Sequence, residues 1–353
     1  VHDCANQIDE NGYTVTTTGT DPSPCSTGNR FWVGLVDSDY ENSGNWSTSS
    51  GGSGGASVPV GSNNVVFDSS SSVNCTMSAS RSMESLMLTN YTGTFSAGSH
   101  SVRVTNDVNA SGSPILDLGS SNWTVGGTWN LRFISGSSTE GTSTVRLTSQ
   151  TGSARWLWKP SGGNFSNVIV AQNAIIDQGR RLDVQGSFTL ESGATWEVGT
   201  SELNIFSDAS FTLGDSSSIT TSTGTVELSA DGTGVRTGNA TASIGNFKTA
   251  NYNTGSLTTI PVATYTGTFR FGQNAGSYNG TWRFEGNTVI EGNVSIGMGK
   301  TTNETIDLAT NNVSLTLKGD VDITPSRGTI TWSAGDGTII FDNSGSQSVN
   351  FNG

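Results

Sequence analysis

Short runs in which apolar and polar residues alternate recur along almost the whole chain. Runs such as Phe188–Leu190 and Trp196–Val198 have the two-residue period of β-strands with one buried face, and Gly, Ser, Asp and Asn separate them. No window of eleven or more residues shows a convincing period of 3.6 residues. We therefore predict an all-β chain with almost no helix.

One segment of the chain occurs twice, as Gly186–Leu190 and as Ala209–Leu213. Flanking apolar positions correspond at the same offset: Trp196 with Ile219, Leu203 with Val226, and Ile205 with Leu228. Within each unit of about 23 residues the apolar pairs lie seven to eight residues apart, which gives three short strands and three turns. This pattern predicts one rung of a parallel β-helix, because stacked rungs satisfy each other's backbone hydrogen bonds.

A second pattern, a Gly/Ser-Thr-Val/Ile-x-Leu/Phe strand followed by a Gly-rich turn, recurs at Ser143–Leu147, Gly224–Leu228 and Gly337–Phe341. Together with phrases such as Trp123–Gly127 and Gly345–Val349, it resembles the repeat-rich β-helical surface proteins of microbes, of the adhesin and autotransporter-passenger type. The resemblance covers about residues 44–353. It implies a β-helix at the cell surface rather than an activity.

The chain divides into an arm and a β-helix. Residues 1–30 are polar and are expected to form an N-terminal arm or cap, with a disulfide between Cys4 and Cys25. The β-helix is expected over residues 31–353, with a flexible Gly/Ser-rich loop at 47–57. Its last rung is expected to be uncapped at Gly353, so that either the chain continues in a longer protein or another subunit stacks there.

Composition and charge exclude several classes of partner. The net charge is −13, and the 16 Lys and Arg residues form no basic stripe, which argues against nucleic-acid binding. No apolar run is long enough to insert into a membrane. A disulfide would require an oxidising compartment, so we expect a secreted or cell-surface chain, in which Cys75 is a buried free thiol.

Asp37, Asp39 and Glu41 place three carboxylates at alternate positions of one loop, an arrangement that could ligate calcium. The segment lacks the glycine at position six and the distal glutamate of a helical calcium loop, and a solvated acidic loop is the alternative. No other cofactor is expected.

Two indoles, Trp156 and Trp158, alternate on one predicted strand. Facing outward they would form a platform for stacking host or surface glycans. Facing inward they would fill the core of a wide rung, which we favour because large apolar groups gain most from burial.

Asn-x-Ser/Thr sequons permit N-glycosylation, although their number is close to that expected by chance in a chain so rich in Ser and Thr. These sequons start at Asn45, Asn74, Asn90, Asn109, Asn122, Asn164, Asn239, Asn279, Asn293, Asn303 and Asn312.

Catalytic constellations are not apparent in the sequence. Acidic residues are scattered over different turns and strands, and the two histidines, His2 and His100, are far apart. The one dense mixed-charge segment, Arg180-Arg181 between Asp177 and Asp183, is expected to be a surface ion-pair cluster. We therefore predict that the protein is not an enzyme.

These observations favour an extracellular structural or adhesive β-helix that binds copies of itself, head to tail or laterally, in a filament, a surface layer or a larger adhesin. One alternative is a phage tail-spike fibre, which requires an outward apolar strip along one face. A polysaccharide lyase or hydrolase built on a β-helix is the other.

Overall fold

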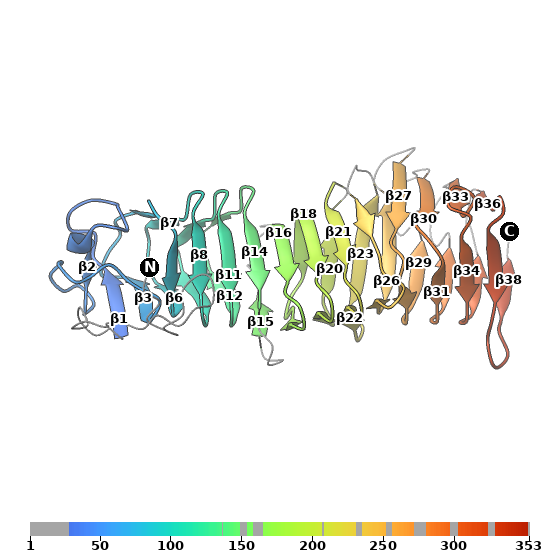
Figure 1. Cartoon of the computed structure of the whole chain (residues 1–353), viewed down its shortest axis with the longest axis horizontal. Coiled ribbons are helices and arrows are strands. Elements are labelled where there is room, and N and C mark those ends of the chain that lie inside the picture. The colour runs from blue at the N-terminus through green and yellow to red at the C-terminus, as the bar shows by residue number, and fades with distance from the viewer. Residues whose placement is uncertain are drawn as a thin grey trace, which may run out of the picture. The chain divides into compact units, whose positions relative to one another are not determined.

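The computed structural model describes residues 28–135, 137–148, 154–157, 165–206, 208–230, 235–251, 256–271, 280–296, 303–323 and 329–351. For residues 132–134, 154–157, 230, 251, 256 and 351 it describes the backbone alone. The described chain is nearly all β, with one short 3-10 helix, η1 (Ser43–Asn45) (Figure 1). It is a parallel β-solenoid with turns of about 23 residues, which confirms the predicted fold class.

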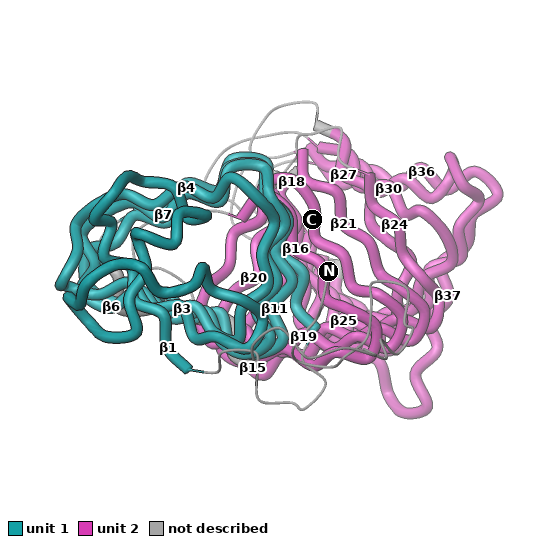
Figure 2. The backbone as a smooth tube through the Cα atoms, turned by 60° about the vertical axis from the view of Figure 1, so that its left-hand side comes forward, with its two compact units in different colours: residues 1–149, 153–163 teal, residues 150–152, 164–353 magenta. Residues whose placement is uncertain are grey.

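The chain forms two compact units, which Figure 2 colours separately. Unit 1 comprises residues 1–149 and 153–163, and unit 2 comprises residues 150–152 and 164–353.

Each rung of unit 1 contributes one strand to each of three faces. The first face contains β1 (Gly28–Trp32), β2 (Trp46–Ser47), β3 (Asn63–Asp68), β6 (Ser85–Thr89), β9 (Val108–Gly112), β12 (Trp129–Ile134) and β15 (Ala154–Leu157). The second face contains β4 (Cys75–Thr76), β7 (Thr94–Ser96), β10 (Ile115–Asp117) and β13 (Ser138–Thr139). The third face contains β5 (Arg81–Met83), β8 (Ser101–Val104), β11 (Asn122–Val125) and β14 (Thr144–Leu147).

Unit 2 also has three faces. The first contains β17 (Ile175–Asp177), β19 (Thr195–Gly199), β22 (Ser218–Thr221), β25 (Ser243–Ile244), β28 (Thr264–Tyr265), β31 (Thr288–Ile290), β34 (Ser314–Leu317) and β37 (Thr338–Phe341). The second contains β16 (Phe165–Val170), β18 (Leu182–Leu190), β20 (Glu202–Ile205), β23 (Thr225–Ala230), β26 (Phe247–Asn251), β29 (Phe269–Phe271), β32 (Val294–Ile296), β35 (Val321–Ile323) and β38 (Val349–Phe351).

The third face of unit 2 is built in two parts. The later halves of β16 and β18 pair with each other, and that of β18 also pairs with β21 (Ser210–Leu213), which pairs with β24 (Arg236–Thr237). A separate sheet then contains β27 (Ser256–Ile260), β30 (Gly280–Phe284), β33 (Glu304–Asp307) and β36 (Ile330–Ser333).

The repeat read from the sequence is the strand register of the unit 2 rungs between Ser187 and Leu228. Phe188 lies opposite Phe211, and Trp196 lies opposite Ile219. Leu203 and Ile205 lie opposite Val226 and Leu228. All of these side chains are buried, at 0 or 1% exposure. The predicted repeat and its inward rows are confirmed.

Neighbouring rungs of unit 1 also pair in parallel, but with other offsets. On the first face Asn64 lies opposite Ser85, which is two residues closer in sequence than Phe211 is to Phe188. On the same face Trp129 lies opposite Trp156, which is four residues further apart. The 23-residue period is therefore not general, because turn lengths vary while the strands keep the same alternation.

Polar turn residues hold successive rungs together. In unit 2 the Asn246 side chain accepts a hydrogen bond from the Thr268 N–H at 3.0 Å, and Asn293 does the same for the Asp320 N–H at 3.0 Å. Asp320 in turn accepts from the Ser348 N–H at 2.8 Å. Where the chain bends, these side chains accept the backbone N–H groups that would otherwise bond to the neighbouring strand. This explains why Asn and Asp separate the strands.

The first residues of the described chain differ from the prediction. The expected arm ended at residue 30, but β1 starts at Gly28 and already pairs in parallel with β3. β2 then returns antiparallel against β1, with Trp32 opposite Trp46. Residues 28–46 therefore form a cap on the first rung instead of a rung. In the loop 47–57, Ala56 N–H bonds to the Trp46 carbonyl at 2.9 Å.

Candidate functional site

The last strands of the three faces of unit 2 are β36, β37 and β38. Among the described residues each has a strand neighbour on one side only, β33, β34 and β35 respectively. We call this surface the end face, and its inward row consists of Trp332, Ile339, Phe341 and Val349.

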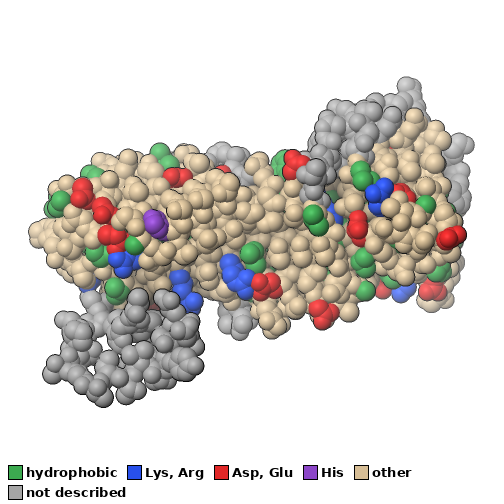
Figure 3. Space-filling view, turned by 45° about the horizontal axis from the view of Figure 1, so that its top comes forward, with side chains coloured by type: hydrophobic (Ala, Val, Ile, Leu, Met, Phe, Trp, Pro, Cys, Tyr) green, Lys and Arg blue, Asp and Glu red, His purple; other side chains and the backbone are tan. Residues whose placement is uncertain are grey.

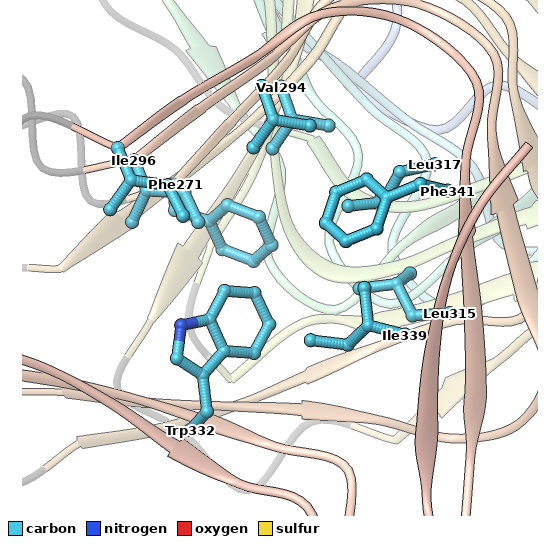
Figure 4. Close-up of a pocket in the computed structure, with 10 residues that line it drawn as sticks. Phe271, Val294, Ile296, Leu315, Leu317, Trp332, Ile339 and Phe341 are labelled. Carbon is cyan, nitrogen blue, oxygen red and sulfur yellow. The ribbon is translucent and has the colours of Figure 1, made fainter. Parts of the chain in front are cut away.

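Apolar side chains line a cavity of about 220 Å³ at the end face (Figure 4). Its lining consists of Phe271, Val294, Ile296, Leu315, Leu317, Val321, Ile323, Trp332, Ile339 and Phe341. None of these residues carries a charge. Phe341 is 49% exposed, whereas Leu317, its neighbour one rung earlier, is 2% exposed. The inward row is therefore open to solvent at this rung.

Exposed large apolar side chains are otherwise few in the described chain. Unit 1 has Leu35, Val36 and Val73, and unit 2 has Val235 and Leu257 apart from the end face. On the surface shown in Figure 3, apolar and charged side chains are scattered among uncharged polar groups and backbone. The described residues do not form the lateral apolar strip that a tail-spike fibre requires.

The predicted calcium ligands do not converge. Asp37 accepts hydrogen bonds from Asn42 at 2.8 Å, Asn45 at 2.6 Å and the Asp39 N–H at 2.9 Å. These bonds, that of Asn42 first, lower the pKa of Asp37. Glu41 instead forms an ion pair with Arg81.

The same residues serve to fold the loop. Asp39 accepts from Ser78 at 2.7 Å and from the Glu41 N–H at 3.0 Å. In the described part of the chain, no group of three or more His, Cys, Asp or Glu residues is placed to hold a metal ion. The alternating carboxylates are therefore explained by local hydrogen bonds, which satisfy the loop's backbone N–H groups and the Asn side chains.

Asn45 is the centre of this loop and is fully buried. Its Oδ1 accepts from the Val36 and Asp37 N–H groups at 2.9 and 3.1 Å, and its Nδ2 donates to Asp37 and to the Asp39 carbonyl. A glycan at Asn45 would remove one of these donor hydrogens and occupy space that the protein fills. We therefore expect Asn45 to carry no glycan in the folded protein.

The other sequons fall into two groups. The side chains of Asn74, Asn90, Asn122, Asn293, Asn303 and Asn312 are exposed or half-buried at turns and strand edges, as are those of Asn109 and Asn239. Asn164 and Asn279 lie outside the described residues. Some of these asparagines also have a structural use: Asn74 and Asn303 accept the backbone N–H groups of Thr94 and Thr329 in the next rung.

Several predicted site residues lie outside the side chains that the structure describes. Cys4 and Cys25 lie outside the described residues, and so does Trp158. Trp156 is described by its backbone, which lies opposite Trp129, a buried core residue. Cys75 is a buried free thiol, as predicted.

A charge network on the second face of unit 2 was only partly visible in the sequence. Lys248 Nζ lies 2.5 Å from Glu202 and 2.6 Å from Glu227, and Arg181 lies 3.1 Å from Glu202 and 2.9 Å from Asp183. We call these five residues the Lys248 network. Its Arg181–Asp183 part is visible in the sequence. The rest is not, because Glu202 and Lys248 lie on different strands that only the pairing of successive rungs brings together.

Glu202 and Lys248 are held in their charged forms. Burial opposes the ionisation of Glu202, but the hydrogen bond and charge of Lys248 outweigh it and lower the pKa of Glu202. Burial likewise opposes the charge of Lys248, and its hydrogen bonds to Glu202 and Glu227 outweigh this effect and raise the pKa of Lys248. Because a general acid or base works best with a pKa near the ambient pH, neither shift suits proton transfer at neutral pH.

We expect Lys248→Met to lower the free energy of unfolding by about 2 kcal/mol at neutral pH, since two carboxylates would lose their shared cation. Because the pKa of Glu202 is lowered in the folded state, its ionisation stabilises the fold at pH values above the ordinary pKa of 4.5. This contribution is lost as the pH falls through the folded-state pKa. The difference between wild type and variant should therefore shrink in acid. Urea unfolding at several pH values measures it.

Lys318→Met is the matched control for this prediction. Lys318 forms a pair with Glu291 at 3.5 Å, and both side chains are at least 40% exposed. Its loss should cost at most about 0.5 kcal/mol. Equal effects of the two substitutions would contradict a structural role for the Lys248 network.

No helix of the described residues is long and apolar enough to cross a membrane. Comparisons with models of protein families, with curated proteins and with solved structures found no match. The likeness to microbial surface proteins therefore depends on the repeat pattern and on the β-solenoid fold.

Proposed function

We propose that the protein is an extracellular structural or adhesive β-solenoid that associates with copies of itself through the end face. The observation that carries this proposal is the end face, where β36, β37 and β38 each have a strand neighbour on one side only among the described residues. Its role is mechanical, because a solenoid in which each rung is hydrogen-bonded to the next resists bending without any chemistry.

Two physical features of the end face support association. Its strand edges present backbone N–H and C=O groups that a further strand would pair, and such edges are normally covered. Its apolar side chains would gain by burial, since Phe341 and Val349 are 49 and 37% exposed. Each fully buried side chain of this size contributes about 1.5–3 kcal/mol.

The extracellular location is supported by the sequence. The repeat pattern resembles that of microbial surface proteins, and the predicted Cys4–Cys25 disulfide would need an oxidising compartment. Mass spectrometry of peptides from the native, unreduced protein tests this part. A cross-linked pair of peptides containing Cys4 and Cys25 supports it, and two free thiols would contradict it.

Sedimentation equilibrium of wild type and Phe341→Asp tests the association. We expect the wild type to form complexes larger than 36.6 kDa as its concentration rises. The variant should need at least about 30-fold higher concentration, because the interface would bury an unpaired charge at a cost of about 2 kcal/mol or more.

Ser344→Asp adds the same charge in an exposed turn of the same rung, outside the cavity lining. This control should associate like the wild type. A wild-type protein that remains monomeric at all concentrations would remove the proposal.

A further inference from the structure

Two arginines of unit 1 lie in one outward row of its third face. Figure 1 shows three strands of this face, β8, β11 and β14, side by side. Strand pairing places Ser82 opposite Arg103 and Thr124 opposite Arg146, and Arg103 lies opposite Thr124. In β8, β11 and β14 the residues on both sides of this row are buried, so its members point outward. We call these four residues the arginine row.

The surroundings of the arginine row are polar and uncharged. A neighbouring outward row consists of Ser101, Asn122 and Thr144, whose hydroxyl and amide groups can donate and accept hydrogen bonds. None of the four strands of this face contains Asp or Glu. The chain as a whole has 29 acidic residues and 16 Lys and Arg residues, so this face differs from the rest in the sign of its charge.

Other arginines of unit 1 have a structural use. Arg30 is 5% exposed and donates to Ser57. Arg81 forms an ion pair with Glu41. Arg103, in contrast, is exposed and has neither an ion pair nor a hydrogen bond within the described chain. Its guanidinium is therefore available to a ligand.

Acidic side chains that follow β5 and β8 are engaged with other groups. Glu84 accepts a hydrogen bond from Asn106 at 3.2 Å, and Asp107 accepts one from the Thr128 N–H at 2.6 Å. Neither forms an ion pair with Arg103. The positive charge of the face is therefore not cancelled by a contact from these two acids.

The spacing of the two arginines sets a requirement for a ligand. Arg103 and Arg146 lie two rungs apart, or about 10 Å at the usual distance between strands. A ligand that meets both must carry at least two anionic groups along an extended chain. Each guanidinium presents a planar fork of donors that suits a carboxylate or a similar oxyanion.

Two classes of polyanion have such a charge pattern, nucleic acids and acidic polysaccharides. Duplex DNA carries one charge per about 1.7 Å, of which two arginines on a protein of net charge −13 would neutralise little. An acidic polysaccharide has hydroxyl groups between its charges. The Ser, Thr and Asn side chains around the arginines can bond to such hydroxyl groups.

We propose that the arginine row binds an acidic polysaccharide, whose carboxylate or sulfate groups pair with Arg103 and Arg146. This inference supplies a ligand for an adhesive role, and it does not depend on the end face.

Fluorescence anisotropy with labelled polysaccharides tests the proposal. The probes are polygalacturonate, dextran sulfate and neutral dextran, and the protein is produced without N-glycosylation because Asn122 lies on this face. We expect at least one of the two polyanions to bind and neutral dextran not to bind. The polyanion that binds identifies the anionic group as carboxylate or sulfate.

Arginine variants locate the contact. Arg103→Gln and Arg146→Gln should each weaken binding by about tenfold, because each removes one charge-assisted contact. Arg180→Gln is the matched control, since it removes the same charge from an exposed position of unit 2. This variant should bind like the wild type.

Four results would overturn the proposal: binding of neither polyanion, equal binding of neutral dextran, equal or tighter binding of single-stranded DNA, or equal losses in Arg180→Gln and Arg103→Gln. Sedimentation of the same variants keeps this test separate from that of the proposed function. Arg103→Gln leaves the end face intact and should associate like the wild type, whether or not polysaccharide binds.

Discussion

Asn45→Ala is expected to open the cap of the first rung and to cost about 3 kcal/mol of local stability, because a buried polar group that loses its partner costs about 1–3 kcal/mol. The substitution removes the acceptor of the Val36 and Asp37 N–H groups and the donor to Asp37 and the Asp39 carbonyl. Four polar groups of the loop, the Val36 and Asp37 N–H groups, the Asp37 carboxylate and the Asp39 carbonyl, therefore lose a partner at once, and part of the cost is recovered as water enters.

Limited proteolysis measures this opening directly. A local cost of about 3 kcal/mol corresponds to cleavage within residues 35–46 that is faster by about 100-fold, provided that opening and closing are rapid. Asn64→Ala serves as the control, because the Asn64 side chain makes one hydrogen bond, to Asn29 at 3.2 Å. Unchanged cleavage in Asn45→Ala would show that the loop does not depend on this side chain.

Trp196→Ala should lower the free energy of unfolding of unit 2 by about 3–5 kcal/mol. Trp196 is fully buried, and its ring packs edge-on against Phe188 with centroids 5.2 Å apart. Its Nε1 donates to Gln178 at 2.7 Å, and Gln178 also bonds to the Arg180 and Glu202 carbonyls. The change therefore creates a cavity and removes a hydrogen-bond partner of a buried amide.

Denaturant unfolding followed by circular dichroism tests the effect of Trp196. Thr220→Ala is the control on the next rung, since Thr220 lies opposite Glu197 and is exposed. The Thr220→Ala control should change the free energy of unfolding by less than about 0.5 kcal/mol. A loss below about 1 kcal/mol in Trp196→Ala would contradict the assignment of this row to the core.

The sequence predicted the register between Ser187 and Leu228 because strand alternation and turn length repeat there together. Phe188 and Phe211 occupy equivalent positions in near-identical segments, so their offset could be read without coordinates. In unit 1 no segment repeats so closely. The pairing of Asn64 with Ser85 and of Trp123 with Val145 could not be derived from the repeat in unit 2.

Residues 28–46 show where periodicity fails as a guide. By their pattern alone, Trp32 and Trp46 could belong to two ordinary rungs. In the structure they pair antiparallel, because the chain turns back within the loop centred on Asn45. The alternating acids at 37, 39 and 41 have the pattern of a cation loop. Only the side-chain partners, Asn42, Asn45 and Arg81, reveal a different use.

The Lys248 network illustrates the same limit. Asn204 lies opposite Glu227, and Glu227 lies opposite Lys248, but the second offset is two residues shorter than the first. Extending the repeat unchanged would place Glu227 opposite Ala250 and separate it from Lys248. The charge pairing therefore depends on a turn that is two residues shorter, and the alternation pattern does not report turn length.

Hydrogen–deuterium exchange at low and high protein concentration tests the central claim, that molecules meet at the end face. The backbone amides of β36, β37 and β38 should exchange more slowly as the complex forms, while those of β1 and β2 should not change. If the sedimented mass rises but β36–β38 gain no protection, the contact lies elsewhere and the account is wrong.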